Sequence, residues 1–491
     1  MRRRVAQPVS SDAHANPEPA ARPNDPVSIG SFLQIFSAVM LPMFLAAADQ
    51  TLLATATPSI AAELGGLRDT TWISVGYLIA MTGTVPLYGR LGDRYGRRDM
   101  LLAALGVFCL GSLACGLATS LGMLVAARVL QGLGGGGLMV MAQSLIGELV
   151  PPRERARFQA YFATVFTLAN VGGPLIGGLV VHHAGWRWLF LMNLPLCAIA
   201  AWRLLRLPRG EGNARATPAD PASALVFAAA VAVSLAWASF AGYRFAWTSG
   251  TSLMLAAASA LLWTALIRRE LRRPDPLLPI ELLRDPSIRY VCLTVIAFAS
   301  CLFALIFFLP VLVQIGHGAD ATRAGALLLP VTLGIVTGST LTGRIVTRTG
   351  RPTPMPVVGL SISCVALLLM SVSPPRSDLI AALGALCGFG FGSVMPTAQI
   401  ISQTLAGRDR LGAVASAVSL SRYIGAALGT AMFGAFVFAL APDSSGSVGQ
   451  HALAASASAQ LSSAIRIGFG ALALIAAAGA WSASRVRPIR L

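Results

Sequence analysis

The sequence predicts an all-α polytopic membrane protein, and three observations support this fold class. The chain of 491 residues is 55% hydrophobic and 12% charged, with a mean hydropathy of +0.70, which a soluble domain could not tolerate on its surface. The apolar residues form runs long enough to cross a bilayer as helices. The arginines gather in the short polar gaps between those runs.

An apolar run of about 20 residues is needed to cross about 30 Å of hydrocarbon as an α-helix. By this measure the chain has fourteen transmembrane helices, and we take each run as one span. The spans lie near 32–57, 71–88, 100–118, 121–147, 158–181, 187–205, 222–242, 249–267, 290–313, 323–345, 355–373, 378–400, 412–440 and 461–484.

The distribution of arginine predicts the orientation, because basic loops stay on the cytoplasmic side. With both termini inside, 29 of the 37 arginines fall in cytoplasmic segments, five in outer loops and three within spans. The prediction is therefore an N-in, C-in, multi-pass protein of the inner or plasma membrane. The net charge of +17 follows the same loops instead of one face or tail, so we exclude nucleic acid as a partner.

An internal repeat predicts the architecture. The polar segment Gly89–Arg98, read as a loop whose glycines let the chain turn tightly, is echoed 254 residues later by Gly343–Pro352. Glycine pairs in the fourth and twelfth spans repeat this offset: Gly134 and Gly136, Gly388 and Gly390. Two six-span halves repeated in parallel predict a substrate site near the bilayer midplane between them, with alternating access by rocking.

Spans seven and eight fall between the two halves and are read as an inserted pair. The predicted segments are a disordered cytoplasmic tail at 1–30, an N-terminal half at 31–205, a cytoplasmic linker at 206–221, the inserted pair at 222–267, a second linker at 268–289, a C-terminal half at 290–484 and a cytoplasmic tail at 485–491.

The sequence has no pattern of residues typical of an enzyme. Its seven cysteines lie in apolar runs without Cys-x-x-Cys spacing, so neither a disulfide framework nor a metal site is indicated. His182 and His183 do not form a metal site by their spacing, and we find no nucleotide loop or Cys/His/Ser constellation. The chain is expected to need no cofactor beyond a proton gradient.

Asp49 lies inside the first apolar run, where a carboxylate has almost no water to hydrate it. A charge at bilayer depth costs roughly 2.5–3.5 kcal/mol on insertion scales, so such an acid is a functional-site hypothesis by default. Arg128, with Gln131 one turn further on, lies within the fourth span and needs a partner of its own. We expect Asp49 and Arg128 to pair, and the pair to couple proton binding to conformation. A static pair that only fixes helix packing is the alternative.

Four patterns carry a resemblance to a known family: Asp49-x-Thr51, Gly89–Arg98, Arg128-x-x-Gln131-Gly132 and Gly173-Pro174-x-x-Gly177-Gly178. With these, the chain resembles the major facilitator superfamily, and specifically its fourteen-span drug:proton antiporter branch of the multidrug efflux type. The resemblance covers nearly the whole chain from Phe32 to about Ser484.

The resemblance implies roles for two of the motifs. The gating motif comprises Gly89, Asp93, Arg94, Gly96, Arg97 and Arg98, and is expected to latch the N-terminal half to the start of span thirteen near Gly412. The antiporter motif comprises Gly173, Pro174, Gly177 and Gly178, and marks exporters more than uptake systems in the family. A positive-inside loop without a gating role, and ordinary packing glycines, are the respective alternatives.

Other polar residues within the spans are candidates for the substrate cavity. They are Trp72, Tyr77, Gln131, Gln143, Asn170, Gln399 and Arg422. An interfacial aromatic belt explains Trp72 equally well, and hydrogen bonds between helices explain the amides. Glu148 and Asp378 fall at span ends and are expected to be surface acids.

The predicted function is a proton-coupled antiporter that exports small amphipathic organic compounds, such as drugs, antibiotics or toxic metabolites. One deep acid against three deep arginines favours neutral, weakly acidic or zwitterionic substrates over dications. A same-fold importer or proton symporter is one alternative, and a non-transporting sensor or enzyme is another. The expected partners are a small-molecule substrate, protons and the lipid bilayer. A periplasmic adaptor protein stays open as a partner, and a monomer is favoured over an oligomer.

Overall fold

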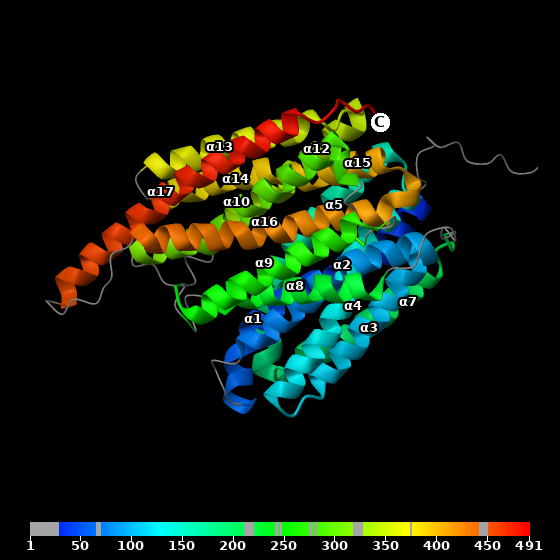
Figure 1. Cartoon of the computed structure of the whole chain (residues 1–491), viewed down its shortest axis with the longest axis horizontal. Helices are drawn as coiled ribbons and strands as arrows, with labels where there is room; N and C mark the ends of the chain where they lie inside the picture. The colour runs from blue at the N-terminus through cyan, green and yellow to red at the C-terminus, as the bar shows by residue number, and fades with distance from the viewer. Residues whose placement is uncertain are drawn as a thin grey trace, which may run out of the picture.

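The structure is a computed structural model of the chain, and it describes residues 29–64, 70–210, 220–240, 245, 248–273, 277–278, 282–317, 328–373, 376–440 and 450–491. Long helices dominate these ranges (Figure 1). Their bounds are α1 Ile29–Leu64, α2 Thr71–Tyr95, α3 Arg97–Gly116, α4 Leu121–Leu149, α5 Pro152–Ala184, α6 Trp188–Leu191, α7 Asn193–Leu205, α8 Pro221–Phe240, α9 Gly250–Leu271, α10 Pro286–His317, α12 Leu328–Thr349, α13 Pro354–Val372, α14 Ser377–Gly392, α15 Val394–Ala406, α16 Leu411–Leu440 and α17 Gln450–Ser484.

Each predicted span overlaps one helix or, for 187–205 and 378–400, a pair of consecutive helices. Within the described ranges, ten helical stretches are long and apolar enough to cross a membrane. The all-α, membrane-spanning fold class is therefore confirmed, while fourteen crossings and the N-in, C-in orientation stay predictions. Nearly all of the predicted tail at 1–30, parts of both linkers and the start of the tenth span lie outside the described residues.

The helices form two groups, each around its own apolar core. We call α1–α7 the N-terminal group and α10–α17 the C-terminal group. One large core joins side chains from Ile35 to Leu207 and also includes Ala415 of α16, and the other joins side chains from Phe298 to Ala476. In Figure 1 most of the first group lies in the lower part of the molecule and much of the second group in the upper part, with α5 beside helices of the second group. Two separate cores are what a two-half architecture requires.

The parallel repeat is visible in the order of the helices. Helices α1, α2, α3, α4 and α5 recur as α10, α12, α13, α14 and α16, each beginning 256–259 residues later. The repeated glycines lie where helices touch: a Cβ at Gly134 or Gly136 would overlap backbone atoms of α3 or α2, and one at Gly388 or Gly390 those of α12 or α13. The boundaries of the predicted segments stay predictions.

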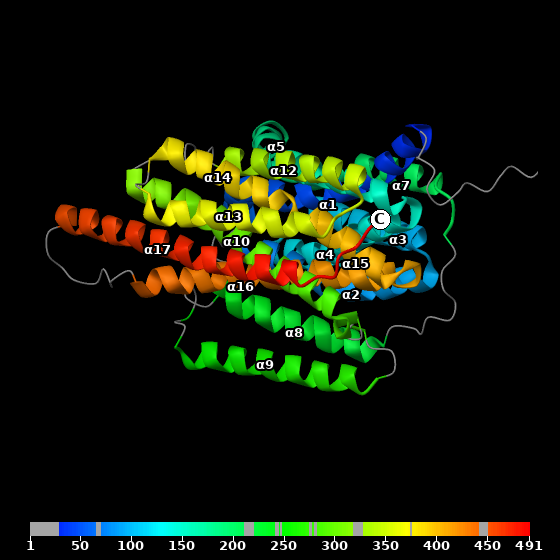
Figure 2. The same ribbon diagram turned by 90° about the horizontal axis from the view of Figure 1, so that it is seen from above.

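Helices α8 and α9 pack on each other outside the main bundle, with α8 against α2 (Figure 2). Phe227 and Leu266 form the centre of their small apolar core. At one end of the pair, Asp220 bonds Arg269 at 2.9 Å and Arg273 at 3.1 Å. The hydrogen bond from Arg269 is the main cause that lowers the pKa of Asp220 from 3.8 to about 2.

The two groups meet along a few helix pairs. Helix α2 lies against α16, and α5 lies against α12. Helix α4 also contacts α16, and α5 contacts α15. Helices α2, α4 and α5, which carry the gating motif, Arg128 and the antiporter motif, therefore reach the boundary between the groups, whereas α1, which carries Asp49, packs within the N-terminal group.

Candidate functional site

A buried ion pair joins α1 to α4 in the N-terminal group. Arg128 Nη1 lies 2.5 Å from Asp49 Oδ2, and the two side chains are 1% and 3% exposed. At about 4 Å and an effective dielectric near 20, such a pair is worth about 4 kcal/mol before desolvation is subtracted. The pair that the sequence predicts is thus formed in this conformation.

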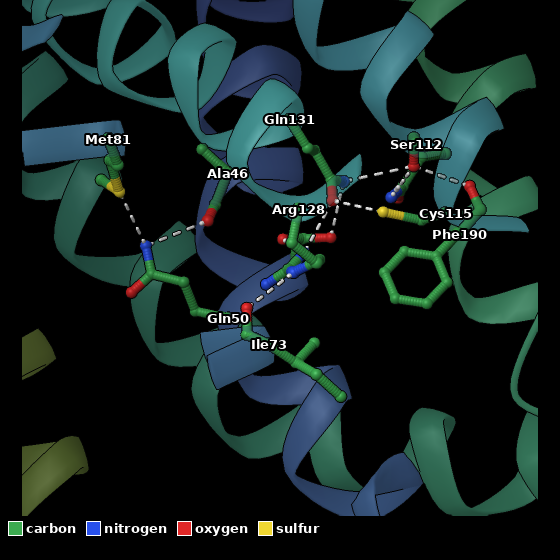
Figure 3. Close-up of polar contacts among 11 residues, drawn as sticks. Ala46, Gln50, Ile73, Met81, Ser112, Cys115, Arg128, Gln131 and Phe190 are labelled. Atoms are coloured by element: carbon green, nitrogen blue, oxygen red, sulfur yellow. Dashed lines mark hydrogen bonds and ion pairs between the residues drawn. The ribbon is translucent and has the colours of Figure 1, made fainter. Parts of the chain in front are cut away.

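Gln131 completes the site, because it lies one helical turn after Arg128 and faces the same side of α4. Its Nε2 donates to Asp49 Oδ1 at 2.9 Å, and its Oε1 accepts from Arg128 Nη1 at 2.7 Å. Both carboxylate oxygens of Asp49 therefore accept a hydrogen bond, and Figure 3 shows how Arg128 and Gln131 lie beside one another. We call Asp49, Arg128 and Gln131 the carboxylate site.

Polar side chains from two further helices support Gln131. Its Nε2 also lies 3.2 Å from Ser112 Oγ on α3. Asn193 on α7 donates to the same oxygen at 2.9 Å, and Ser112 donates to the carbonyl of Phe190 at 2.9 Å. The sequence does not single out Ser112 or Asn193 as candidates. A small polar residue inside an apolar run is the only signal that points to them.

Aromatic rings cover the guanidinium of Arg128. Its Cζ lies 4.3 Å from the centre of the Tyr77 ring and 5.6 Å from that of Phe190. Tyr77 is 1% exposed, so it is part of the wall of the carboxylate site. Trp72, five residues earlier on α2, is half-buried. Cation–π contacts with desolvated rings favour the charged guanidinium.

The gating motif makes a contact between the two groups. Asp93 accepts hydrogen bonds at 2.9 Å from the backbone N–H groups of Gly412 and Ala413, at the first turn of α16. Those N–H groups have no partner within the helix, and the helix dipole favours a carboxylate there. Burial raises the pKa of the Asp93 carboxyl above its usual 3.8, and Arg97 and the two N–H groups oppose this rise. We call Asp93, Gly412 and Ala413 the cap contact.

Arg97 and Arg98 of the gating motif bind residues of neighbouring helices. Arg97 bonds Asp93 at 2.8 Å and Glu148 at 2.9 Å. Glu148, expected as a surface acid, is half-buried at the end of α4, where its carboxylate pairs with Arg97. Arg98 donates to the carbonyl groups of Leu204 and Leu205, at the end of α7.

The predicted loop at Gly89–Arg98 is mostly helical, which corrects the sequence prediction. Helix α2 runs on to Tyr95, and the chain turns only at Gly96, whose φ of 95° suits glycine. Gly89 instead allows close approach, since a Cβ there would lie 2.7 Å from the carbonyl oxygen of Gly412. Arg94 lies against the Tyr95 ring at 5.3 Å.

Amide side chains make a second contact between the groups. Gln399 Nε2 on α15 donates to Gln143 Oε1 on α4. Gln403 Nε2 donates to the backbone carbonyl of Gln143 at 3.1 Å. All three glutamines are buried. The structure thus brings Gln143 and Gln399 together, away from Asp49, in a contact we call the amide bridge.

The antiporter motif lies on α5, which packs against α1 and against α12 of the other group. Gly173 and Gly177 are buried. Gly178 is exposed, and a Cβ there would meet no atom within 4 Å. The side chains of Asn170 and Pro174 lie outside the described part of the structure.

Arg422 lies apart from the carboxylate site, on α16. Its Cζ is 4.6 Å from the centre of the Tyr423 ring and 5.8 Å from that of Phe166 on α5. The side chain is half-buried. Arg422 therefore lies at the boundary between the groups. Asp378, expected as a surface acid, is exposed in the first turn of α14.

This arrangement, a helical bundle in two groups with a buried ion pair and contacts between the groups, is that of a multi-pass membrane transporter and not of an enzyme. The sequence profile of the Major Facilitator Superfamily matches residues 39–430. The chain belongs to the major facilitator superfamily.

Curated relatives include transporters of bacteria. The chain is 35% identical over 411 residues to an uncharacterized MFS-type transporter of Mycobacterium tuberculosis, a match that covers 82% of this chain and 59% of the relative. It is 32% identical to the multidrug transporter protein MdtP of Bacillus subtilis, over 82% of this chain and 74% of that protein. It is 28% identical to multidrug resistance protein 3 of the same species, over 81% and 78%. The chain thus spans less than two thirds of the mycobacterial relative.

Solved structures agree on the fold. The human organic anion transporter MFSD10 aligns with a TM-score of 0.66 at 15% identity, over 92% of this chain and 99% of that one. The proton:xylose symporter XylE aligns with a TM-score of 0.61 at 14% identity, over 93% and 96%. At such identities the likeness concerns the fold alone.

Proposed function

We propose that this protein is a proton-coupled antiporter of the fourteen-span drug:proton branch, which exports small amphipathic organic compounds. The carboxylate site is the observation that carries the proposal. Asp49 is the one acid within the first apolar run, and it is held by Arg128 and Gln131 away from water. The names of the two Bacillus relatives, both concerned with multidrug transport or resistance, support export of drug-like compounds.

In this proposal the protonation of Asp49 controls the conformation. While Asp49 is ionised, it stabilises α1 against α4 through both of its oxygens. A proton on one oxygen removes the charge that Arg128 pairs with, and so weakens the contact between these helices. Export then follows from binding the proton on one side of the membrane and releasing it on the other.

The cap contact and the amide bridge both hold the two groups together in this cycle. Both join the two groups, and both involve the ends of helices that the arginine pattern puts on the cytoplasmic side. We assign this conformation to the state closed towards the cytoplasm. Opening to the cytoplasm has to break both contacts.

The test is efflux from proteoliposomes that contain the full chain, with an imposed pH gradient and a panel of amphipathic compounds. We expect substrate-dependent proton movement with wild-type protein and none with Asp49→Asn. Asp378→Asn is the matched control, because it neutralises an exposed acid far from the carboxylate site, and it is expected to leave transport unchanged. Undiminished proton-coupled efflux by Asp49→Asn would refute the coupling assignment.

The same assay decides between export and import. An importer or symporter moves protons in the same direction as the compound, whereas an antiporter moves them in the opposite direction. The direction of proton flux in inverted vesicles distinguishes these cases. The antiporter motif at Gly173 and Gly177 favours opposite directions.

A further inference from the structure

Arg422 is a charged residue deep in a predicted span that has no acidic partner among the described residues. It lies eleven residues after the start of α16, which is about 16 Å along the helix axis and close to the middle of about 30 Å of hydrocarbon. In the part of the chain that the structure describes, no carboxylate pairs with it. The α-helices of the C-terminal group contain a single acid, Asp378, at the exposed start of α14, and Asp409 lies in the short 3-10 helix Arg408–Arg410 that precedes α16.

The other two arginines within the predicted spans have oxygen partners. Arg128 pairs with Asp49. Arg466 on α17 donates from Nε to the backbone carbonyl of Ser371 at 3.2 Å, within the C-terminal group. A guanidinium at this depth is costly unless an oxygen acceptor neutralises it. The rings of Phe166 and Tyr423 supply cation–π contacts to Arg422, and the Tyr423 hydroxyl also interacts with it, but neither residue supplies a negative charge.

The position of Arg422 connects it to the carboxylate site. Tyr423 Oη lies 4.0 Å from Met81 Sδ on α2. The same sulfur accepts from Gln50 Nε2 at 3.5 Å, and Gln50 follows Asp49 in the chain. A molecule bound at Arg422 would therefore contact both groups. The side chains of Tyr423 and Met81 would link it to Gln50, the neighbour of Asp49. This is where a transporter of this architecture binds its substrate.

We propose that Arg422 binds the negative group of the transported molecule, and that the substrates include aromatic carboxylates. This inference rests on the proposed function. A guanidinium offers two parallel N–H groups to a carboxylate, and the Arg422 side chain is half-buried and so partly accessible. Phe166 and Tyr423 flank the charge with rings against which an aromatic body can stack. The substrate itself then supplies the counter-charge that no described residue supplies to Arg422.

A structural role for Arg422, as a cation–π link that only holds α16 near α5, makes a different prediction. If Arg422 is only such a link, its substitution would change the affinity for all compounds equally. An anion site discriminates between compounds that have the same shape and differ in charge. Matched probes therefore separate the two roles.

The experiment measures binding of naphthalene-2-carboxylate and its neutral isostere naphthalene-2-carboxamide to the purified full chain by calorimetry. We expect wild-type protein to bind the carboxylate about tenfold more tightly than the amide. Arg422→Gln should lose this preference while its affinity for the amide stays unchanged, and Arg422→Lys should retain part of it. Arg466→Gln is the control, because it removes a deep charge outside the boundary between the groups, and its preference should equal that of wild type.

Equal affinity of wild-type protein for both probes, absence of binding of either, or an equal loss of both in Arg422→Gln would overturn the inference. Unchanged binding of the amide also demonstrates that Arg422→Gln is folded. If carboxylate binding depends on Arg422 but no compound moves protons in proteoliposomes, the proposed function fails and the anion site stands. If neutral compounds are exported with proton exchange and carboxylates do not bind, the anion site fails and the proposed function stands.

Discussion

At the residue scale, the function depends on how the protein stabilises one carboxylate in an apolar surrounding. Asp49 and Arg128 are 79 positions apart in the chain and 2.5 Å apart in space. The sequence predicts their pairing because each charge needs a partner at that depth. It does not predict Ser112 or Asn193, because a serine or asparagine in a span bonds many kinds of neighbour at little cost.

The stability of the pair is testable by removing one or both charges. Arg128→Met leaves Asp49 buried without its partner, which we expect to destabilise the protein by about 3–5 kcal/mol. The double variant Asp49→Leu/Arg128→Met removes both charges and should recover most of that loss. Denaturant unfolding in detergent measures the free energy of unfolding of the double variant and of its two single variants. A double variant at least as unstable as the sum of its single variants would contradict a pairwise role for these charges.

A second residue-scale prediction concerns pH. Hydrogen bonds from Arg187 Nη1 and Trp186 Nε1 lower the pKa of Glu63 from its usual 4.5. A carboxyl with a lowered folded pKa contributes stability that is present above its unfolded pKa and is lost as the pH falls through the folded value. We therefore expect Glu63→Gln to be less stable than wild type at neutral pH and equal to it well below pH 4.5.

Thermal unfolding of both proteins across this range measures the difference. The control is Asp378→Asn, since Asp378 forms no ion pair in the described part of the chain. A difference between Glu63→Gln and wild type that does not change with pH would show that the charge of Glu63 has no role in the contact.

At the element scale, the relevant contact is between α2 and α16. The sequence predicts that Asp93 faces the start of the opposing half, and the cap contact has that geometry. It does not predict that α2 continues to Tyr95, because several glycines together are typical of a turn. Tertiary contacts decide instead: Gly89 is needed for close approach and only Gly96 for its backbone angle.

This close approach gives a third prediction. Gly89→Ala places a methyl group against the carbonyl of Gly412 and should separate α2 from α16, which weakens the cap contact. We expect transport to fall severalfold and spin labels at the two helix ends to move apart. Gly106→Ala on α3 is the matched control, because a Cβ there meets no atom within 4 Å. Unchanged label distances in Gly89→Ala would contradict a closing role for the cap contact.

At the scale of the whole molecule, the parallel repeat is the feature that the sequence reveals best. The offset between two motifs predicts two six-span halves repeated in parallel, and five helices of the N-terminal group recur in order in the C-terminal group. The sequence reveals less about the inserted pair, since uniformly apolar helices show which segments are buried but not which neighbour covers them. The contact of α8 with α2 is therefore a finding of the structure.

The two groups differ in their charges as well as in their cores. The N-terminal group contains the acid that we assign to the proton, and the C-terminal group contains Arg422, which we assign to the substrate. Separate sites in the two groups allow proton and substrate to act on the same boundary without sharing a residue. Their coupling then passes through the contacts between α2, α5 and α16.

The most direct test of the central claim is proton release on substrate binding, measured with a pH indicator in weakly buffered detergent solution. We expect wild-type protein to release protons to the solution when an exported compound binds. Asp49→Asn should bind the compound without releasing protons. Equal proton exchange by wild type and Asp49→Asn would show that another group binds the proton, and that Asp49 is not the residue that couples protons to transport.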